Sequence, residues 1–150
     1  MSLTPAGPDR RDASRKALEE AIHAFYGARI RGDMEEYASY FAPDARMTII
    51  GNPVLSPGAG LRMGRESIMR FLQILHEENS YLSHSITDIV QEGDQVVVRW
   101  QAEVRLLDSG RTGSFEVLDH LRIKDNLIVE LTHFHDTGGM AIAHGRIRIA

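Results

Sequence analysis

A single carboxylate stands in an otherwise apolar stripe of the segment 114–136, which reads SFEVLDHLRIKDNLIVELTHFHD. The two-residue period of a strand places Asp119 on the same face as Val117 and Leu121. A one-residue slip would bury the chargeable side chains of the opposite face, so the apolar face must be the inner one. Burial should raise the pKa of Asp119, which suits a general acid or a hydrogen-bond donor. The alternative is a buried acid that is hydrogen-bonded to a group of the first helix or of the backbone and has no role in chemistry.

The same segment ends in two histidines, His133 and His135, which share a face of the second predicted strand. They would lie diagonal to Asp119 if the intervening turn had an odd number of residues. Imidazole titrates near neutrality, so either histidine could be a general base, with Asp119 orienting it or donating. An inert, hydrogen-bonded pair of histidines is the first alternative. A metal site built from two imidazoles and one carboxylate is the second, but His-x-His without further ligands leads us to assign no metal.

Three helices are predicted ahead of these strands. The first should begin near Asp12 or Ser14. Asp33 should cap a second, shorter helix over 34–42, and a third should cover 65–78. Each helix has apolar residues at helical spacing, so one stripe of each faces a core. The stripe of the first helix consists of Leu18, Ile22, Phe25 and Arg29.

Strands are predicted over 45–50, 83–91 and 95–107, followed by the two arms of the hairpin. Helices at the front and strands at the back predict an α+β domain, with a curved antiparallel sheet wrapped around three N-terminal helices. The glycine- and proline-rich segment 51–64 is predicted to be a connection, either a plain surface loop or a lid over a pocket.

The chain of 150 residues has the length of one domain. Its hydrophobic content of 43% and charged content of 25% are typical of globular proteins. We divide it into a disordered lead-in over 1–12, one domain over 13–140 and a C-terminal tail over 141–150.

Composition also excludes several function classes. The net charge is −4 with both signs interspersed, which argues against nucleic acid or a membrane surface as a partner. The absence of cysteine excludes disulfides, thiolate chemistry and cysteine-based zinc sites, and is compatible with a cytoplasmic location. The sequence has neither a secretory signal nor an apolar run of ~20 residues. It also lacks a glycine-rich phosphate loop, so no organic cofactor is implied.

Three stretches carry a family resemblance: FYGARIRGDMEEYASYFAPDARMTI, GRESIMRFL and FEVLDHLRIKDNLIVELTHFHD. They resemble the nuclear-transport-factor-two-like superfamily, in its SnoaL-like and ketosteroid-isomerase-like branch. With the order of elements, the resemblance covers nearly the whole chain after residue 12. It implies a cystatin-like, cone-shaped α+β barrel that has a hydrophobic pocket between sheet and helices and usually forms dimers.

The resemblance carries over to single residues only in part. Asp119 matches the protonated acid of the steroid isomerases, which donates with a tyrosine to the enolate oxygen of the substrate. Phe25 takes the place of that tyrosine, and Tyr26 lies roughly 100° further round the helix. Ile49 takes the place of the general base and cannot accept a proton. The Asp–Arg–Asp set of limonene-epoxide hydrolases is also absent, and His133 falls about where one of its aspartates would lie.

We therefore expect a small enzyme that performs cofactor-free proton transfer (isomerisation, cyclisation or dehydration) on a small apolar metabolite. The alternative is a non-catalytic domain of the same fold that binds a small molecule or a partner protein. The outer sheet face should expose Leu118, Ile128 and Phe134, which favours a homodimer through that face. The predicted substrate-binding side chains are Phe25, Tyr26, Met47, Ile49, His84, Trp100 and Val117.

Overall fold

The computed structural model describes residues 8–150, with side chains from residue 13 onward. The first seven residues of the predicted lead-in lie outside the described residues. Helix α1 begins at Pro8, earlier than the predicted start at Asp12 or Ser14. The elements follow one another as α1 Pro8–Arg31, α2 Met34–Ser39, β1 Phe41–Ile49, β2 Gly60–Met63, α3 Arg65–Glu78, β3 Asn79–Glu92, β4 Gln95–Leu106, β5 Thr112–Lys124, β6 Leu127–His135 and α4 Thr137–Ala143.

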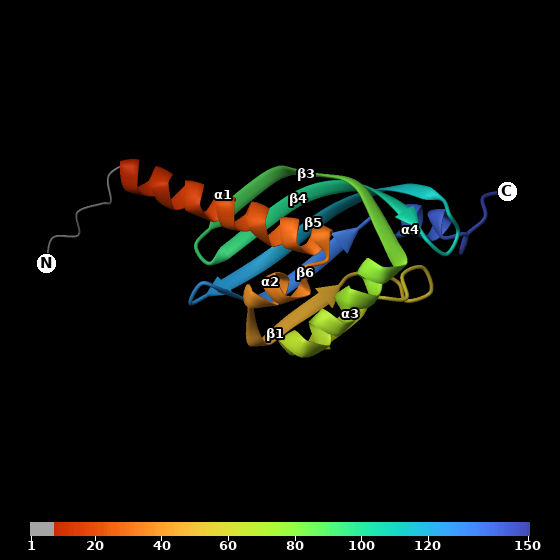
Figure 1. Ribbon diagram of the computed structural model, residues 1–150, viewed down its shortest axis with the longest axis horizontal. Coiled ribbons are helices and arrows are strands. Elements are labelled where there is room, and N and C mark those ends of the chain that lie inside the picture. The colour runs from red at the N-terminus through yellow and green to blue at the C-terminus, as the bar shows by residue number, and fades with distance from the viewer. Residues whose placement is uncertain (1–7) are drawn as a thin grey trace, which may run out of the picture.

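The six strands form one curved sheet in the order β2-β1-β6-β5-β4-β3, with α1, α2 and α3 on one side of it (Figure 1). The fold is therefore α+β, as predicted. The sheet is not purely antiparallel, because β1 pairs with β6 in parallel. These two strands are distant in the chain, so no hairpin dictates their direction. Strand β2 was not predicted, and it pairs with β1 from within the segment 51–64.

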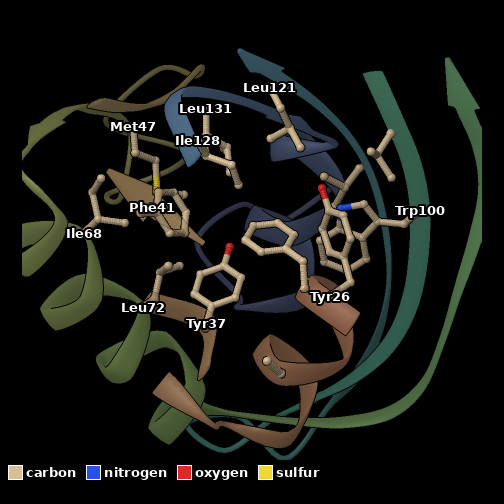
Figure 2. Packing of buried hydrophobic residues seen from close by; sticks show 14 of the residues in the cluster. Tyr26, Tyr37, Phe41, Met47, Ile68, Leu72, Trp100, Leu121, Ile128 and Leu131 are labelled. Carbon is tan, nitrogen blue, oxygen red and sulfur yellow. The ribbon is translucent and has the colours of Figure 1, made fainter. Parts of the chain in front are cut away.

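Buried side chains from the helices and the sheet fill the space between them. Ile22 and Phe25 of α1 and Ile68 and Leu72 of α3 are buried, as their helical spacing predicts. Figure 2 shows Tyr26 beside Trp100 at the sheet, with Tyr37 and Leu72 on the opposite side of the core. Local signals position the helices, since the Asp33 side chain caps α2 by accepting from the Glu36 amide at 3.0 Å.

The β5–β6 hairpin turns through two residues, Asp125 and Asn126, with φ values of 52° and 61°. Such a two-residue turn with both φ positive matches the twist of the flanking strands. This turn alone would pair Asp119 with Thr132, but the register shifts by one residue between Arg122 and Ile123. Asp119 therefore faces His133 directly across the ladder, rather than diagonally. This register sets up the site described below.

An irregularity beside Ile123 shifts the register of this hairpin near the turn. It brings Ile128 onto the inner face, where only 5% of the residue is exposed. The prediction that Ile128 would be exposed is therefore wrong. Leu118 and Phe134 lie on the outer face as predicted, at 40% and 43% exposure.

Strand β6 is followed by a short helix that was not predicted. Asp136 caps α4 by accepting from the Gly139 amide at 2.9 Å. Helix α4 crosses residue 141, the predicted boundary between the domain and the tail. Within the described residues, no helix is long and apolar enough to cross a membrane.

Candidate active site

Asp119 lies in the interior, 3% exposed, and both of its carboxylate oxygens are engaged. Oδ1 lies 2.6 Å from Nδ1 of His133. Oδ2 accepts from the Tyr26 hydroxyl at 2.6 Å and from Nε1 of Trp100 at 2.9 Å. Four elements contribute to this cluster, because the residues come from α1, β4, β5 and β6.

The electrostatics of the cluster contradict the expected raised pKa of Asp119. Burial alone would raise it, but the charge of His133 and the hydrogen bonds from His133, Tyr26 and Trp100 outweigh burial and lower the pKa of Asp119. Burial, followed by the neighbouring Asp119, raises the pKa of Tyr26 well above its ordinary value. Asp119 is therefore an ionised acceptor and Tyr26 a protonated donor, so Asp119 is not the proton-donating acid that we expected.

An ionised Asp119 fixes the tautomer of His133. The carboxylate can only accept, so Nδ1 of His133 carries the proton of their 2.6 Å hydrogen bond. The ring lines a cavity, and when the ring is neutral, Nε2 is the nitrogen with a free lone pair, on the side away from Asp119. This arrangement is typical of a histidine base that a carboxylate orients.

The cavity has a volume of about 390 Å³ and lies where the ends of α3 and α4 approach the sheet. Met47 and Ile49, two of the predicted substrate-binding residues, line it together with His133 and His135. The segment 51–64 forms one wall, so it is more than a plain surface loop. Further lining side chains include Arg29, Leu55, Arg62, Phe71, Leu75, Tyr81, Val104, Phe115 and Met140.

The remaining predicted substrate-binding residues are not among the side chains that line this cavity. Tyr26 and Trp100 are buried behind His133 and hold Asp119. Phe25 stacks on Tyr37 at 4.5 Å, so Tyr26, and not Phe25, is the aromatic residue of α1 that contacts Asp119.

Val117 and His84 also lie away from the cavity. Val117 packs in the core at 3% exposure. His84 lies on β3 with its ring 5.5 Å from that of Trp100, and burial lowers its pKa.

His135 lies beside His133 in the cavity wall, with ring centroids 5.1 Å apart. Burial, followed by the charge of His133, lowers the pKa of His135 to about 4. The ring is therefore neutral at pH 7, and its buried Nδ1 has no hydrogen-bond partner among the described residues. Those residues also contain no group of three histidine, aspartate or glutamate side chains placed to hold a metal ion.

We expect the protein to become less stable as the pH falls from about 6.5 to about 4, because the pKa of His135 is lower in the folded chain than in the unfolded chain. In this interval the unfolded chain protonates His135 and the folded chain does not, so added protons favour unfolding. The full effect would be about 3 kcal/mol, and partial exposure of the ring reduces the expected loss to about 1–2 kcal/mol.

Urea unfolding of the wild type and of His135→Phe at pH 7 and pH 4.5 measures this loss, and the variant should lose less. His120→Ala is the matched control, because His120 lies on the outer side and contacts Gln95. An equal loss in His135→Phe and wild type would contradict the assignment.

Arg29 and Tyr81 are cavity residues that our sequence analysis did not select. Arg29 did carry a signal, since it is a charged residue at a core position of the α1 stripe. Tyr81 carried none, because it precedes the predicted strand over 83–91, whereas β3 begins at Asn79.

Residues 22–131 match the family model of the SnoaL-like domain. Among curated proteins, none matches the chain. The structure is similar to an NTF2-like protein from Burkholderia thailandensis, with 23% identity, a TM-score of 0.71, and coverage of 83% of this chain and 94% of that chain. It is also similar to an LEH-like epoxide hydrolase from M. tuberculosis, with 16% identity, a TM-score of 0.64, and coverage of 85% and 88%.

A third similar structure is a protein with a ketosteroid isomerase-like fold from Catenulispora acidiphila, with 14% identity, a TM-score of 0.70, and coverage of 83% and 91%. At these identities the solved structures establish a shared fold. The family match spans more than half of the chain, and the observed sheet and helices agree with the predicted cone. This chain therefore belongs to the SnoaL-like domain family.

Proposed function

We propose that this protein is an enzyme that moves a proton next to a carbonyl group, without a cofactor, with His133 as the base. The observation that carries the proposal is the pair of Asp119 and His133, joined at 2.6 Å at the wall of a cavity of about 390 Å³. A carboxylate behind an imidazole is the arrangement that makes the exposed nitrogen a better base. The fold alone would not support this, because it hosts many functions.

In the proposed reaction, Nε2 of His133 takes a proton from the carbon beside the carbonyl group, and the electron pair of that C–H bond forms an enolate. The carboxylate of Asp119 stabilises the imidazolium that results. The imidazolium then returns the proton to another position of the same molecule, which is an isomerisation. His135, neutral and in the same wall, supplies a hydrogen bond to the carbonyl oxygen.

Hydrogen exchange tests this proposal without knowledge of the natural substrate. The protein is incubated in D₂O with a panel of cyclic and aryl ketones, and NMR measures the loss of protons beside the carbonyl group. We expect exchange above the buffer rate for at least one ketone whose body fits the cavity. Unaccelerated exchange across the panel, with tight binding of some members, would favour the alternative of a binding domain.

Both carboxylate oxygens of Asp119 have hydrogen-bond partners, which also fits a non-catalytic binding domain, since a buried acid paired in this way can be part of a purely structural core. Ligand affinity separates the two functions. A binding domain would retain its ligand when His133 is changed to alanine, with no turnover in either protein.

We also propose that the protein forms a homodimer through the outer face of the sheet. Leu118 and Phe134 face each other across β5 and β6 and are 40% and 43% exposed, which gives this face an apolar centre. We expect Phe134→Asp to convert the dimer into a monomer in light scattering at about 10 µM protein. Val54→Asp, in the exposed segment 51–64, is the control and should leave the dimer intact. A monomeric wild type would contradict this proposal.

A further inference from the structure

The cavity contains a buried positive charge that proton transfer by His133 does not use. Arg29 lies in the last turn of α1, on the stripe that faces the core, and is only 7% exposed. It lines the same cavity as His133 and His135. An arginine in a protein keeps its charge at any physiological pH, so this charge must be compensated where it lies.

The protein compensates Arg29 incompletely. Its Nη2 donates to the Tyr81 hydroxyl at a long 3.3 Å, and its guanidinium carbon lies 5.7 Å from the centre of the Trp100 ring. Its Nε is buried and has no hydrogen-bond partner in the described chain. No carboxylate of residues 13–150 lies within ion-pair distance of it. The nearby Asp119 already engages both oxygens with His133, Tyr26 and Trp100.

The other charged groups around the cavity do not supply the missing negative charge. Arg62 also lines the cavity, where it stacks over Phe71 at 3.5 Å and donates to the Gly58 carbonyl at 2.8 Å. Arg146 is a third arginine of the lining, whereas Glu78 is its single carboxylate. The cavity therefore combines a positive lining with apolar walls.

We propose that the substrate carries a carboxylate on an apolar body and that this carboxylate binds Arg29. A guanidinium with an unused Nε–H presents a planar pair of donors that suits the two oxygens of a carboxylate. Entry of such a ligand would satisfy Nε and pair the buried charge, while the apolar body would pack on Ile49, Leu75 and Val104. This inference extends the proposed function by naming the substrate class, but the binding itself does not require catalysis.

Matched acids and amides test the binding. Calorimetry measures the affinities of 2-naphthoate, 4-phenylbutyrate and cyclohexylacetate, each beside its primary amide, which has the same body without the charge. We expect the wild type to bind at least one acid roughly 10–100-fold more tightly than its amide. Equal affinity of acids and amides, or no binding of any acid, would overturn the proposal.

Variants of Arg29 then test whether this residue causes the tighter binding of the acid. Arg29→Met should abolish the preference for the acid, and amide affinity should fall far less than acid affinity. Arg29→Lys should keep part of the preference, because lysine retains the charge without the planar donors. Arg105→Met is the matched control, since Arg105 is an exposed arginine of β4 outside the cavity. A preference that persists in Arg29→Met would overturn the proposal. If Arg29→Met did not fold, the comparison of Arg29→Lys with the wild type would decide.

Exchange measurements keep this proposal distinct from the proposed function. The keto acid 4-oxo-4-phenylbutanoate and its amide are incubated with the protein in D₂O. Arg29-dependent binding of the acid without accelerated exchange would uphold the carboxylate site and refute catalysis. Exchange of acid and amide at equal rates would uphold catalysis and refute the carboxylate site.

Discussion

We expect His133→Ala to lower the rate of hydrogen exchange on a responsive ketone by about 10³-fold. The variant removes the nitrogen proposed to take the proton and leaves the walls of the cavity in place. Binding of the ketone should change little, because most of its contacts are apolar. NMR measures the exchange rate in D₂O, and calorimetry measures the affinity for the same ketone.

His135→Ala and His120→Ala are the comparisons for this result. His135 is in the same wall, but the hydrogen bonds of Asp119 among the described residues go to His133, Tyr26 and Trp100. Loss of His135 should therefore affect the rate by a smaller factor. His120 lies on the outer side of β5 and contacts Gln95, so its loss should leave the rate unchanged. A larger fall in His135→Ala than in His133→Ala would transfer the role of base to His135, which our sequence analysis also allowed.

Asp119 should give the largest effect on stability. Asp119→Ala leaves Nδ1 of His133, the Tyr26 hydroxyl and Nε1 of Trp100 without an acceptor in the interior. Breaking a buried charged network in this way lowers the free energy of unfolding by about 3–5 kcal/mol. For a chain of this length, the melting temperature should fall by roughly 10–15 °C. Thermal and urea unfolding measure both quantities.

Asp119→Asn separates catalysis from stability. An amide of the same size can still accept from Tyr26 and Trp100, so the variant should fold. Its NH₂ group facing Nδ1 would shift the proton of His133 to Nε2, and the exchange rate should fall by roughly 10³–10⁴-fold. Asp88→Asn is the control, because Asp88 is an exposed residue that lies 3.9 Å from Arg99. A folded Asp119→Asn variant with full activity would refute the orienting role.

Helix α3 and strand β4 show why much of the fold could be predicted from local pattern. The apolar residues of 65–78 recur at helical spacing, and the observed helix has these same bounds. Strict alternation in β4 buries Val98, Trp100 and Val104, as predicted. In both elements one face is buried, and the spacing of apolar residues along the sequence shows which face that is.

Alternation along the sequence did not correctly predict the burial of Ile128 or the direction in which the pKa of Asp119 shifts. Alternation predicts the wrong face for Ile128, because a register shift in the ladder depends on pairing with a neighbouring strand. The sign of the pKa shift depends on donors from three other elements, and sequence separation does not show which side chains will meet the carboxylate.

The sequence by itself determined the α+β class, the bounds of α3, the inward face of β4 and the burial of one carboxylate among apolar residues, because these follow from periodicity along the chain. Only the tertiary structure decided which groups surround that carboxylate: Tyr26 rather than Phe25, and His133 directly opposite. The rotation of roughly 100° between neighbouring residues of α1 and the register shift beside Ile123 settle these contacts. They also decide that Asp119 is ionised, because hydrogen bonds and charges act over a few ångströms in space, regardless of distance along the chain.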